Sequence, residues 1–190
     1  MKTSINATHF ENIPVFADGG KDKYAIHVII ETPRDIRNKY QFDEKYGIFK
    51  LGSVIAEGLT WPYDYGFIPQ TLGDDGDPLD VLFLADEPTF TGCLSDARLI
   101  GIIRLLKNGE ENDRLLACPP RMKGVAQKTD DFDDVDDIPK DTMRSIATFL
   151  VEYSEEENNE IEFKGVASRN KALKALESGH KLWKKKRKKR

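Results

Sequence analysis

Apolar and polar residues alternate over short stretches in the first two-thirds of the chain, a pattern typical of β-strands. The stretch 23–33, KYAIHVIIETP, is rich in β-branched residues and ends at a proline, so we expect a strand that stops there. The stretch 39–54 alternates and breaks at Tyr46-Gly47, which predicts a hairpin. Residues 80–84 form a short apolar run, which predicts a strand buried on both faces.

A second hairpin is predicted further along the chain. Two apolar stretches, 97–106 and 113–120, flank the polar segment KNGEEN. Asn108-Gly109 within it favours a tight turn, because both residues tolerate positive φ. We therefore expect two antiparallel strands joined at this pair.

The hydrophobic period changes to that of a helix after Pro139, a residue that favours a helix start. The apolar residues at positions i, i+3, i+4 and i+7 are Met143, Ile146, Ala147 and Leu150. The acidic stretch before them, DDFDDVDD at 130–137, favours the dipole of the helix, and we expect no metal site there. A second helix is expected from about Ser168, with Leu173, Leu176 and Trp183 on one stripe.

Several short strands followed by helices predict an α+β fold. In a closed or nearly closed barrel, the backbone groups at the edges of such strands find hydrogen-bond partners, so we expect this architecture. The chain has no internal repeat and no low-complexity linker, so we expect one domain over residues 1–183, followed by a basic tail at 184–190.

The composition is that of a protein with a substantial core, since 39% of the 190 residues are hydrophobic and 33% are charged. No apolar run approaches the roughly 20 residues that a bilayer span requires. The first residues, MKTSINATHFENIP, show no apolar signal core, and the two cysteines do not make a disulfide framework. We therefore expect a cytoplasmic protein that does not contact a membrane.

The net charge of −4 conceals an uneven distribution. The tail KKKRKKR holds seven of the 29 basic residues, which leaves 22 basic against 33 acidic residues, or −11, in the rest of the chain. An excess of acidic residues outside the tail differs from the basic surface that is typical of folded nucleic-acid-binding domains. We expect the tail to be a solvated end, and weak, salt-dependent binding of nucleic acid or another polyanion is the alternative.

Three aspartates, Asp75, Asp77 and Asp80, lie within six residues in the segment DDGDPLD. Like charges this close repel one another unless they are solvated or share a cation. A calcium loop of the EF-hand type is excluded, because Leu79 occupies its fifth position. Carboxylates on a small-residue turn before a buried strand instead suit Mg²⁺ that protein and substrate phosphates hold together.

The stretch from Tyr63 to Val81, which contains YDYGFIP and DGDPLD, resembles the soluble family I inorganic pyrophosphatases, whose hallmark is D-x-D-P-x-D. Taken with IIETPRDIRNKY at 29–40, the resemblance extends over roughly residues 13–155. It implies an OB-like five-stranded β-barrel with flanking α-helices, assembled as a homo-oligomer. It also implies hydrolysis of pyrophosphate to two phosphates with several Mg²⁺ ions, or with Mn²⁺ or another divalent ion in their place.

The same resemblance assigns roles to individual residues. Asp75 and Asp80 would hold metal ions, Glu31 would lie near one, and Asp77 would contact metal and act as the general base. Lys39 and Tyr153 would bind phosphate oxygens, and Tyr65 would line the site and orient the substrate. A carboxylate base suits this reaction, because metal coordination lowers the pKa of water to roughly 7.

Several positions depart from the family pattern. The replacements, with the family residue in brackets, are Gln41 (Glu), Ser53 (Arg), Trp61 (Tyr), Lys107 (Asp), Asn112 (Asp), Arg114 (Lys) and Ser154 (Lys). Together they make the site more positive, so we expect the metal sites beside the second hairpin to be weakened. Our hypothesis is that Lys107 and Arg114 bind phosphate directly. Asp113 would reach the site only if a bulge turned it inward, since neighbouring strand residues face opposite ways.

Three functions remain open on the sequence. The first is a working pyrophosphatase with reduced or altered activity, because the aspartate trio and its tyrosines are present. The second is a phosphate-binding or assembly module without catalysis, because several ligands are replaced. The third is a hydrolase of another phosphoanhydride.

Overall fold

The protein is described here by a computed structural model that covers residues 10–156 and 159–188. Its strands are β1 (Ala25–Thr32), β2 (Asn38–Asp43), β3 (Ile48–Val54), β4 (Asp64–Phe67), β5 (Asp80–Phe83), β6 (Leu94–Lys107), β7 (Glu110–Glu111), β8 (Arg114–Cys118) and β9 (Ile161–Ser168). The α-helices are α1 (Lys140–Glu156) and α2 (Arg169–Arg187), and 3₁₀ turns lie at η1 (Phe10–Asn12), η2 (Ala17–Gly19) and η3 (Val135–Asp137).

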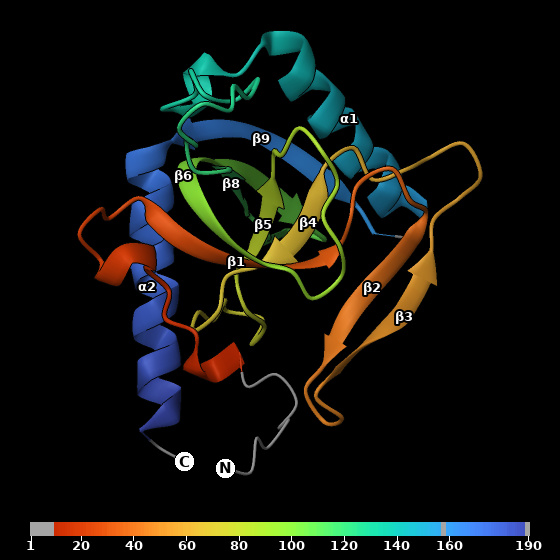
Figure 1. Cartoon of the computed structure of the whole chain (residues 1–190). Coiled ribbons are helices and arrows are strands. Elements are labelled where there is room, and N and C mark those ends of the chain that lie inside the picture. Colours follow the sequence, from red (N-terminus) through yellow and green to blue (C-terminus); the bar gives the residue numbers. More distant parts are fainter. Residues whose placement is uncertain (1–9, 157–158, 189–190) are drawn as a thin grey trace.

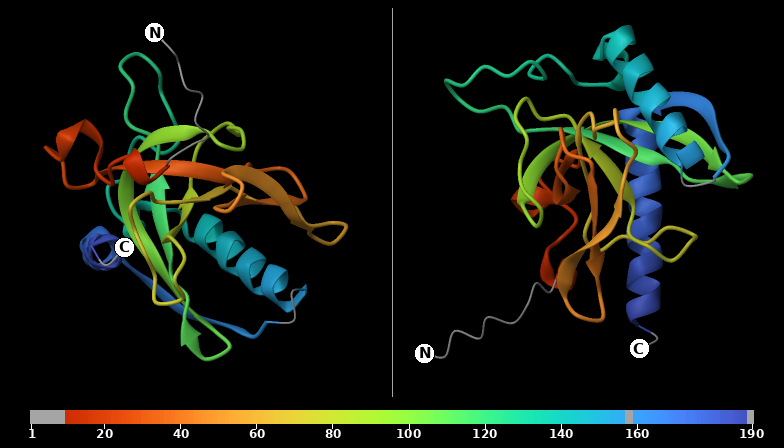
Figure 2. Two further views of the ribbon diagram at one scale, coloured as in Figure 1. Left: turned by 90° about the horizontal axis from the view of Figure 1, so that it is seen from below. Right: turned by 90° about the vertical axis from the view of Figure 1, so that its right-hand side faces the viewer.

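Five strands close into a ring. β1 pairs with β4, β4 with β5, β5 with β8, β8 with β6, and β6 pairs back with β1. Only the β5–β8 pair in this ring is parallel. β7 and β9 add to β6, while β2 and β3 form a separate hairpin that projects from the barrel (Figures 1 and 2). The expected α+β fold with an OB-like five-stranded barrel and flanking helices is confirmed.

The barrel strands are buried on both faces, as predicted for residues 80–84. Val81 and Phe83 belong to one apolar cluster, which includes the buried stripe of α2. Leu82 and Leu84 belong to a second cluster, which lies under α1. The two helices therefore cover different sides of the barrel (Figure 1).

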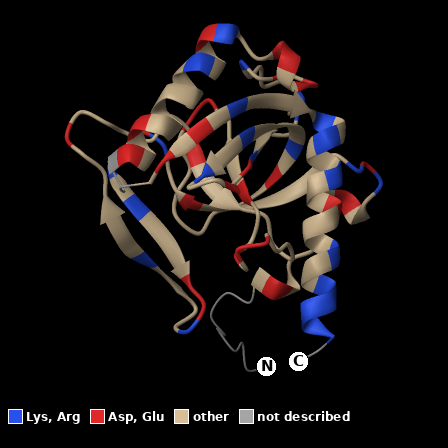
Figure 3. Ribbon diagram, turned by 180° about the vertical axis from the view of Figure 1, so that it is seen from behind, with Lys and Arg blue, Asp and Glu red and all other residues tan. Residues whose placement is uncertain are grey.

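The predicted helices and hairpins are present, and the tight turn is as expected, with φ of 53° at Asn108 and 83° at Gly109. Three strands were not predicted: β4, which has four residues, β7, which lies in the expected turn segment, and β9, which runs directly into α2. α2 continues through Arg187, so the basic run begins inside the helix, at the lower end of α2 in Figure 3. Within the described residues, no helix has both the length and the apolar character that a membrane span needs.

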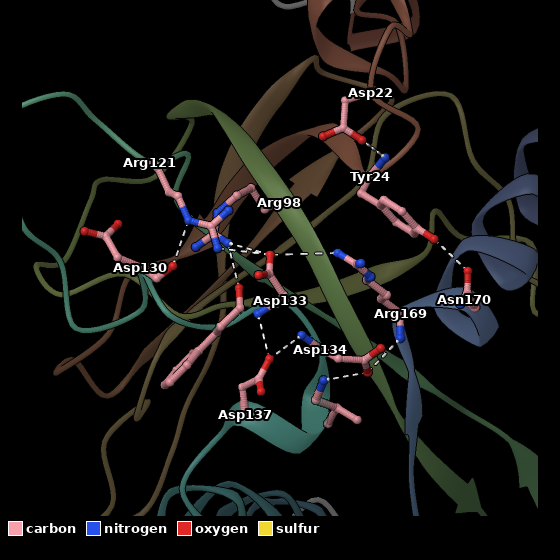
Figure 4. Close-up of polar contacts among 12 residues, drawn as sticks. Asp22, Tyr24, Arg98, Arg121, Asp130, Asp133, Asp134, Asp137, Arg169 and Asn170 are labelled. Carbon is pink, nitrogen blue, oxygen red and sulfur yellow. Dashed lines mark hydrogen bonds and ion pairs between the residues drawn. The ribbon is translucent and has the colours of Figure 1, made fainter.

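A polar network fastens the segment after β8 to the barrel (Figure 4). Arg98 on β6 donates to the carbonyl oxygens of residues 119, 129 and 132, at 3.0, 2.7 and 2.6 Å. The Asp133 carboxylate faces three guanidinium groups, at 3.0 Å from Arg121, 3.8 Å from Arg169 and 3.9 Å from Arg98. Asp134 caps η3 and also accepts the backbone N–H of Arg169. The acidic stretch 130–137 is thus a structural anchor for β6 and α2.

Candidate active site

Neighbouring strands of the ring carry the charged and phenolic groups of the candidate site. Glu31 lies near the end of β1, Tyr65 on β4, Asp80 at the start of β5 and Arg114 at the start of β8. β1, β4, β5 and β8 are consecutive in the ring, so residues far apart in the sequence meet here. A Cβ built on Gly66 would lie 2.0 Å from the carbonyl oxygen of Ile29, so glycine is needed for β4 to approach β1 this closely.

The aspartates lie on a compact turn before β5. The N–H of Gly73 donates to the carbonyl of Asp77 at 2.7 Å, and the N–H of Asp77 donates to Oδ1 of Asp75 at 3.1 Å. Gly76 has φ of 94°, a conformation that disfavours residues with a Cβ. Asp75 and Asp77 are exposed, whereas Asp80, fixed by the strand, is half-buried. The turn therefore presents two carboxylates to solvent above a third that is anchored.

The carboxylates of the site lie close enough to raise one another's pKa values. Burial raises the pKa of Glu31 to about 7; Asp80 and Asp77 add to this rise, while the Phe42 N–H and Lys39 oppose it. The pKa of Asp77 is also raised, because neighbouring atoms exclude part of the water around its carboxylate. The charges of Asp75 and Asp80 raise it further. The four carboxylates thus form one electrostatic cluster.

Lys39 and Tyr153 meet beside this cluster. The ammonium of Lys39 on β2 donates to the phenolic oxygen of Tyr153 on α1, and it also lies 5.0 Å from the centre of the Tyr153 ring. Trp61 packs against both Tyr65 and Tyr153, at ring-centre distances of 5.0 and 5.1 Å. Burial raises the pKa of Tyr65 well above its usual value, so this phenol stays protonated and can donate.

Arg114 is paired with the anchored aspartate. Its Nη1 lies 3.0 Å from Oδ2 of Asp80, and its Nη2 donates to Oδ1 of Asn112 at 2.6 Å. Desolvation, the largest influence, would lower the pKa of Arg114, but the charges of Asp80, Tyr65, Asp75 and Tyr153 together outweigh it and the pKa is raised. The Asp80 carboxylate also adds to the rise that burial causes in the pKa of Tyr65. The site therefore contains a fixed cation as well as its acidic groups.

The second hairpin places the two remaining candidates, Asp113 and Lys107, away from Arg114. Asp113 pairs with Nε of Arg104 at 2.7 Å and accepts the N–H of Leu105, so it faces away from Arg114 and Asn112, as expected for a hairpin without an inward bulge. Lys107 is the last residue of β6, opposite Glu110 and Ile161. It lies four positions beyond Ile103, the partner of Arg114, which is about 13 Å along a strand.

Three further replaced positions lie around the site. Gln41 on β2 is exposed, and its side chain lies over Gly52 of β3. Ser53 is exposed opposite Lys39 in the β2–β3 pair, and Ser154 is buried on α1 next to Tyr153. None of these neutral side chains supplies the charge of the family residue.

The donor set has the chemistry that a hard divalent cation prefers, because Asp75, Asp77, Asp80 and Glu31 offer carboxylate oxygens and repel one another. The set is not preassembled, however. Among the residues that the structure describes, no three acidic, histidine or cysteine side chains converge closely enough to hold one ion. Binding an ion here requires the side chains to rearrange.

Sequence reasoning missed the residues that support the aspartate turn from behind. The buried hydroxyl of Thr71 donates to the carbonyl of Ile68 at 2.6 Å and accepts the N–H of Leu79 at 3.0 Å. α2 adds a second support, since the carbonyl of Gly179 accepts the N–H of Leu72 at 3.1 Å. The sequence carries no local signal for either contact, because the partners are brought together only by packing.

The fold and the site together define a class: an OB-like barrel protein in which clustered carboxylates lie beside a lysine, an arginine and tyrosines. The family model described as inorganic pyrophosphatase matches residues 28–184. The chain belongs to the inorganic pyrophosphatase family.

Individual relatives agree with this assignment. An inorganic pyrophosphatase of Halalkalibacterium halodurans is 39% identical over 140 residues, which are 72% of this chain and 82% of the relative. One of Haloferax volcanii is 35% identical over 159 residues, 83% of this chain and 88% of the relative. The crystal structure of the inorganic pyrophosphatase from Thermus thermophilus superposes with a TM-score of 0.83 at 28% identity, over 93% of this chain and 99% of that one.

Proposed function

We propose that this protein hydrolyses inorganic pyrophosphate to two phosphates with the help of divalent metal ions. The observation that carries the proposal is the joint cluster of Asp75, Asp77, Asp80 and Glu31 beside the Lys39–Tyr153 pair. Membership of the inorganic pyrophosphatase family, whose members depend on divalent metals, supports it.

The acidic residues of the site would have two roles, metal binding and proton transfer. Asp75, Asp80 and Glu31 would hold the ions, which neutralise the charge of pyrophosphate and make a water molecule more acidic when bound. Asp77, exposed on its turn, accepts the proton of the attacking water.

The basic and phenolic side chains of the site would hold the substrate. Lys39 and the phenol of Tyr153 bind phosphate oxygens, and the protonated phenol of Tyr65 orients the substrate. Arg114 adds a guanidinium, which can contact two phosphate oxygens at once. Lys107, at the end of β6, contributes to phosphate binding only if the substrate draws the hairpin inward.

Phosphate release from pyrophosphate, measured while Mg²⁺ is titrated, tests this proposal. Asp77→Asn should lower kcat at least about 10²-fold, because it removes the general base while preserving the size of the side chain. Asp74→Asn, an exposed aspartate of the same turn, is the matched control and should retain activity within about twofold. Equal activity of the two variants would refute the role of Asp77.

One observation favours a second function, a phosphate-binding or assembly module without catalysis. Arg114 already neutralises Asp80, and no described set of three acidic residues converges on an ion. Under this alternative the wild-type protein releases no phosphate from pyrophosphate, nucleotides or polyphosphate. Release from nucleotides or polyphosphate alone would instead indicate a hydrolase of another phosphoanhydride.

Three finer properties belong to the proposal: the ion, the oligomeric state and the location. Mg²⁺ is the proposed ion, with Mn²⁺ or another divalent ion as the alternative. A homo-oligomer is supported by the exposed apolar side chains of β3, namely Ile48, Leu51 and Val54. A cytoplasmic location is supported by the two free cysteines, Cys93 and Cys118.

The division into a domain at 1–183 and a tail at 184–190 stays a prediction. The basic run is expected to be a solvated end, with weak, salt-dependent binding of nucleic acid or another polyanion as the alternative.

A further inference from the structure

Arg114 is held in place by four contacts. Nη1 lies 3.0 Å from Oδ2 of Asp80 and also donates to the backbone carbonyls of Asn112 and Asp113, at 2.9 and 3.1 Å. Nη2 donates to the side-chain oxygen of Asn112 at 2.6 Å. Only 14% of the Arg114 side chain is exposed. In the ligand-free protein this guanidinium is therefore part of the site rather than an exposed surface charge.

Arg114 forms its ion pair with Asp80, the carboxylate that β5 holds in place. Asp80 is the first residue of β5, next to Arg114 across the parallel β5–β8 pair. The same carboxylate adds to the rise that burial causes in the pKa of Tyr65. A divalent ion that approaches Asp80 must therefore displace a hydrogen-bonded cation, and two cations on one carboxylate repel each other.

Phosphate offers the displaced guanidinium a new partner. Arginine binds phosphate oxygens through paired N–H donors, as strongly as it binds a carboxylate. Arg114 lies with its guanidinium carbon 5.9 Å from the centre of the Tyr65 ring, and Tyr65 is among the proposed substrate-binding residues.

We propose that Arg114 is the resident counter-ion of Asp80 in the ligand-free protein and transfers to phosphate when a divalent ion binds Asp80, so that metal and phosphate bind cooperatively. This inference rests on the proposed function only in placing phosphate at this site. Because coupling between two ligands is reciprocal, phosphate must tighten metal binding by the same factor as metal tightens phosphate binding. The metal alone binds weakly.

Calorimetric titration of the full chain with Mn²⁺, with and without saturating inorganic phosphate, tests the coupling without any turnover. For the wild-type protein, phosphate should lower the Kd for Mn²⁺ by a factor of about 5 to 150. Arg114→Gln frees Asp80, so it should bind Mn²⁺ alone about tenfold more tightly than the wild type and lose most of the effect of phosphate.

The matched control is Arg104→Gln. Arg104 lies on the same hairpin but pairs with Asp113 and Glu111 on the face away from the site, so both Mn²⁺ affinities should stay within about twofold of the wild type. Asn112→Ala, which removes one support of the guanidinium, should shift Mn²⁺ affinity in the same direction as Arg114→Gln but less. It tests the inference if Arg114→Gln does not fold.

Two outcomes would overturn the inference: equal Mn²⁺ affinity of the wild type with and without phosphate, or unchanged affinity in the variants that free Asp80. Neither depends on hydrolysis. A protein that shows the coupling but releases no phosphate from pyrophosphate would refute the proposed function and leave the role of Arg114 standing.

Discussion

At the scale of single residues, the aspartate turn depends on side chains that never touch substrate. The hydroxyl of Thr71 is buried and joins both ends of the turn, at Ile68 and Leu79. A buried polar group stabilises a structure only while its partners are present, and losing one partner leaves the other unsatisfied. The position of the carboxylates is therefore sensitive to a residue outside the hallmark.

We expect Thr71→Val to lower the free energy of unfolding by about 1–3 kcal/mol, because the N–H of Leu79 loses its acceptor in the interior. Hydrolysis of pyrophosphate should fall more than a loss of folded protein explains, since the turn is no longer fixed. Urea unfolding and phosphate release measure the two effects. Thr148→Val, on the exposed face of α1, is the control and should change neither.

The two cysteines should differ in reactivity from unfolded thiols. Burial raises the pKa of Cys118 to about 12. At pH 8 its thiolate fraction is then about 10³-fold lower than that of an unperturbed thiol. A colorimetric thiol reagent should therefore leave Cys118 unmodified in the native protein and modify it in guanidinium chloride. Rapid modification of both cysteines without denaturant would contradict this.

At the scale of elements, α2 and the aspartate turn form one unit. The carbonyl of Gly179 accepts the N–H of Leu72, and the ring of His180 hydrogen-bonds to the carbonyl of Gln70 at 2.7 Å. A Cβ built on Gly179 would lie 2.7 Å from Cδ1 of Leu79 and 3.1 Å from the carbonyl oxygen of Leu72. Glycine in mid-helix is thus required by the close approach of the turn.

Gly179→Ala provides a test in which two effects have opposite signs. Alanine favours a helix over glycine by about 1 kcal/mol, so an isolated helix would gain stability. Here the clash with Leu79 and Leu72 should dominate, and we expect a net loss of about 1–2 kcal/mol together with weaker hydrolysis. Thermal melting and phosphate release check this, with exposed Ser178→Ala as the control. A raised melting temperature would show that α2 does not constrain the turn.

At the scale of the whole molecule, the polar network around Asp133 ties the segment after β8 to both β6 and α2 (Figure 4). A hydrogen bond from Arg121 lowers the pKa of Asp133, and the charges of Arg121, Arg169 and Arg98 add to the effect. A carboxyl group with a lowered folded-state pKa stabilises the protein above its unfolded pKa, and this contribution is lost as pH falls through the folded value.

We therefore expect Asp133→Asn to be less stable than the wild type at pH 7. The difference should begin to shrink as pH falls below about 4, the pKa of the unfolded carboxyl group, and should disappear as pH falls through the lower folded-state pKa. Urea midpoints at pH 7 and pH 3 measure it, with the neighbouring exposed Asp131→Asn as the control. A gap that is the same at both pH values would exclude an electrostatic role for Asp133.

The elements could be predicted from the sequence where their signals are local. The apolar stripe that includes Ile146 and Leu150 predicted α1, and Asn108-Gly109 predicted the tight turn that follows β6. Both signals are local, because hydrophobic period and positive φ depend on neighbouring residues alone. β4 escaped prediction, since four residues around Gly66 carry too short a pattern. β9 was also missed, because its residues are mostly half-exposed and gain their strand conformation from pairing with β6.

For the site, the sequence by itself determined which groups are present: the spacing of Asp75, Asp77 and Asp80 is a local property of one turn, and it led to the family. Only the tertiary structure decided their partners. The pairing of Asp80 with Arg114, the meeting of Lys39 with Tyr153 and the outward turn of Asp113 follow from strand register and helix packing. These depend on contacts between distant segments, which no local pattern of residues records.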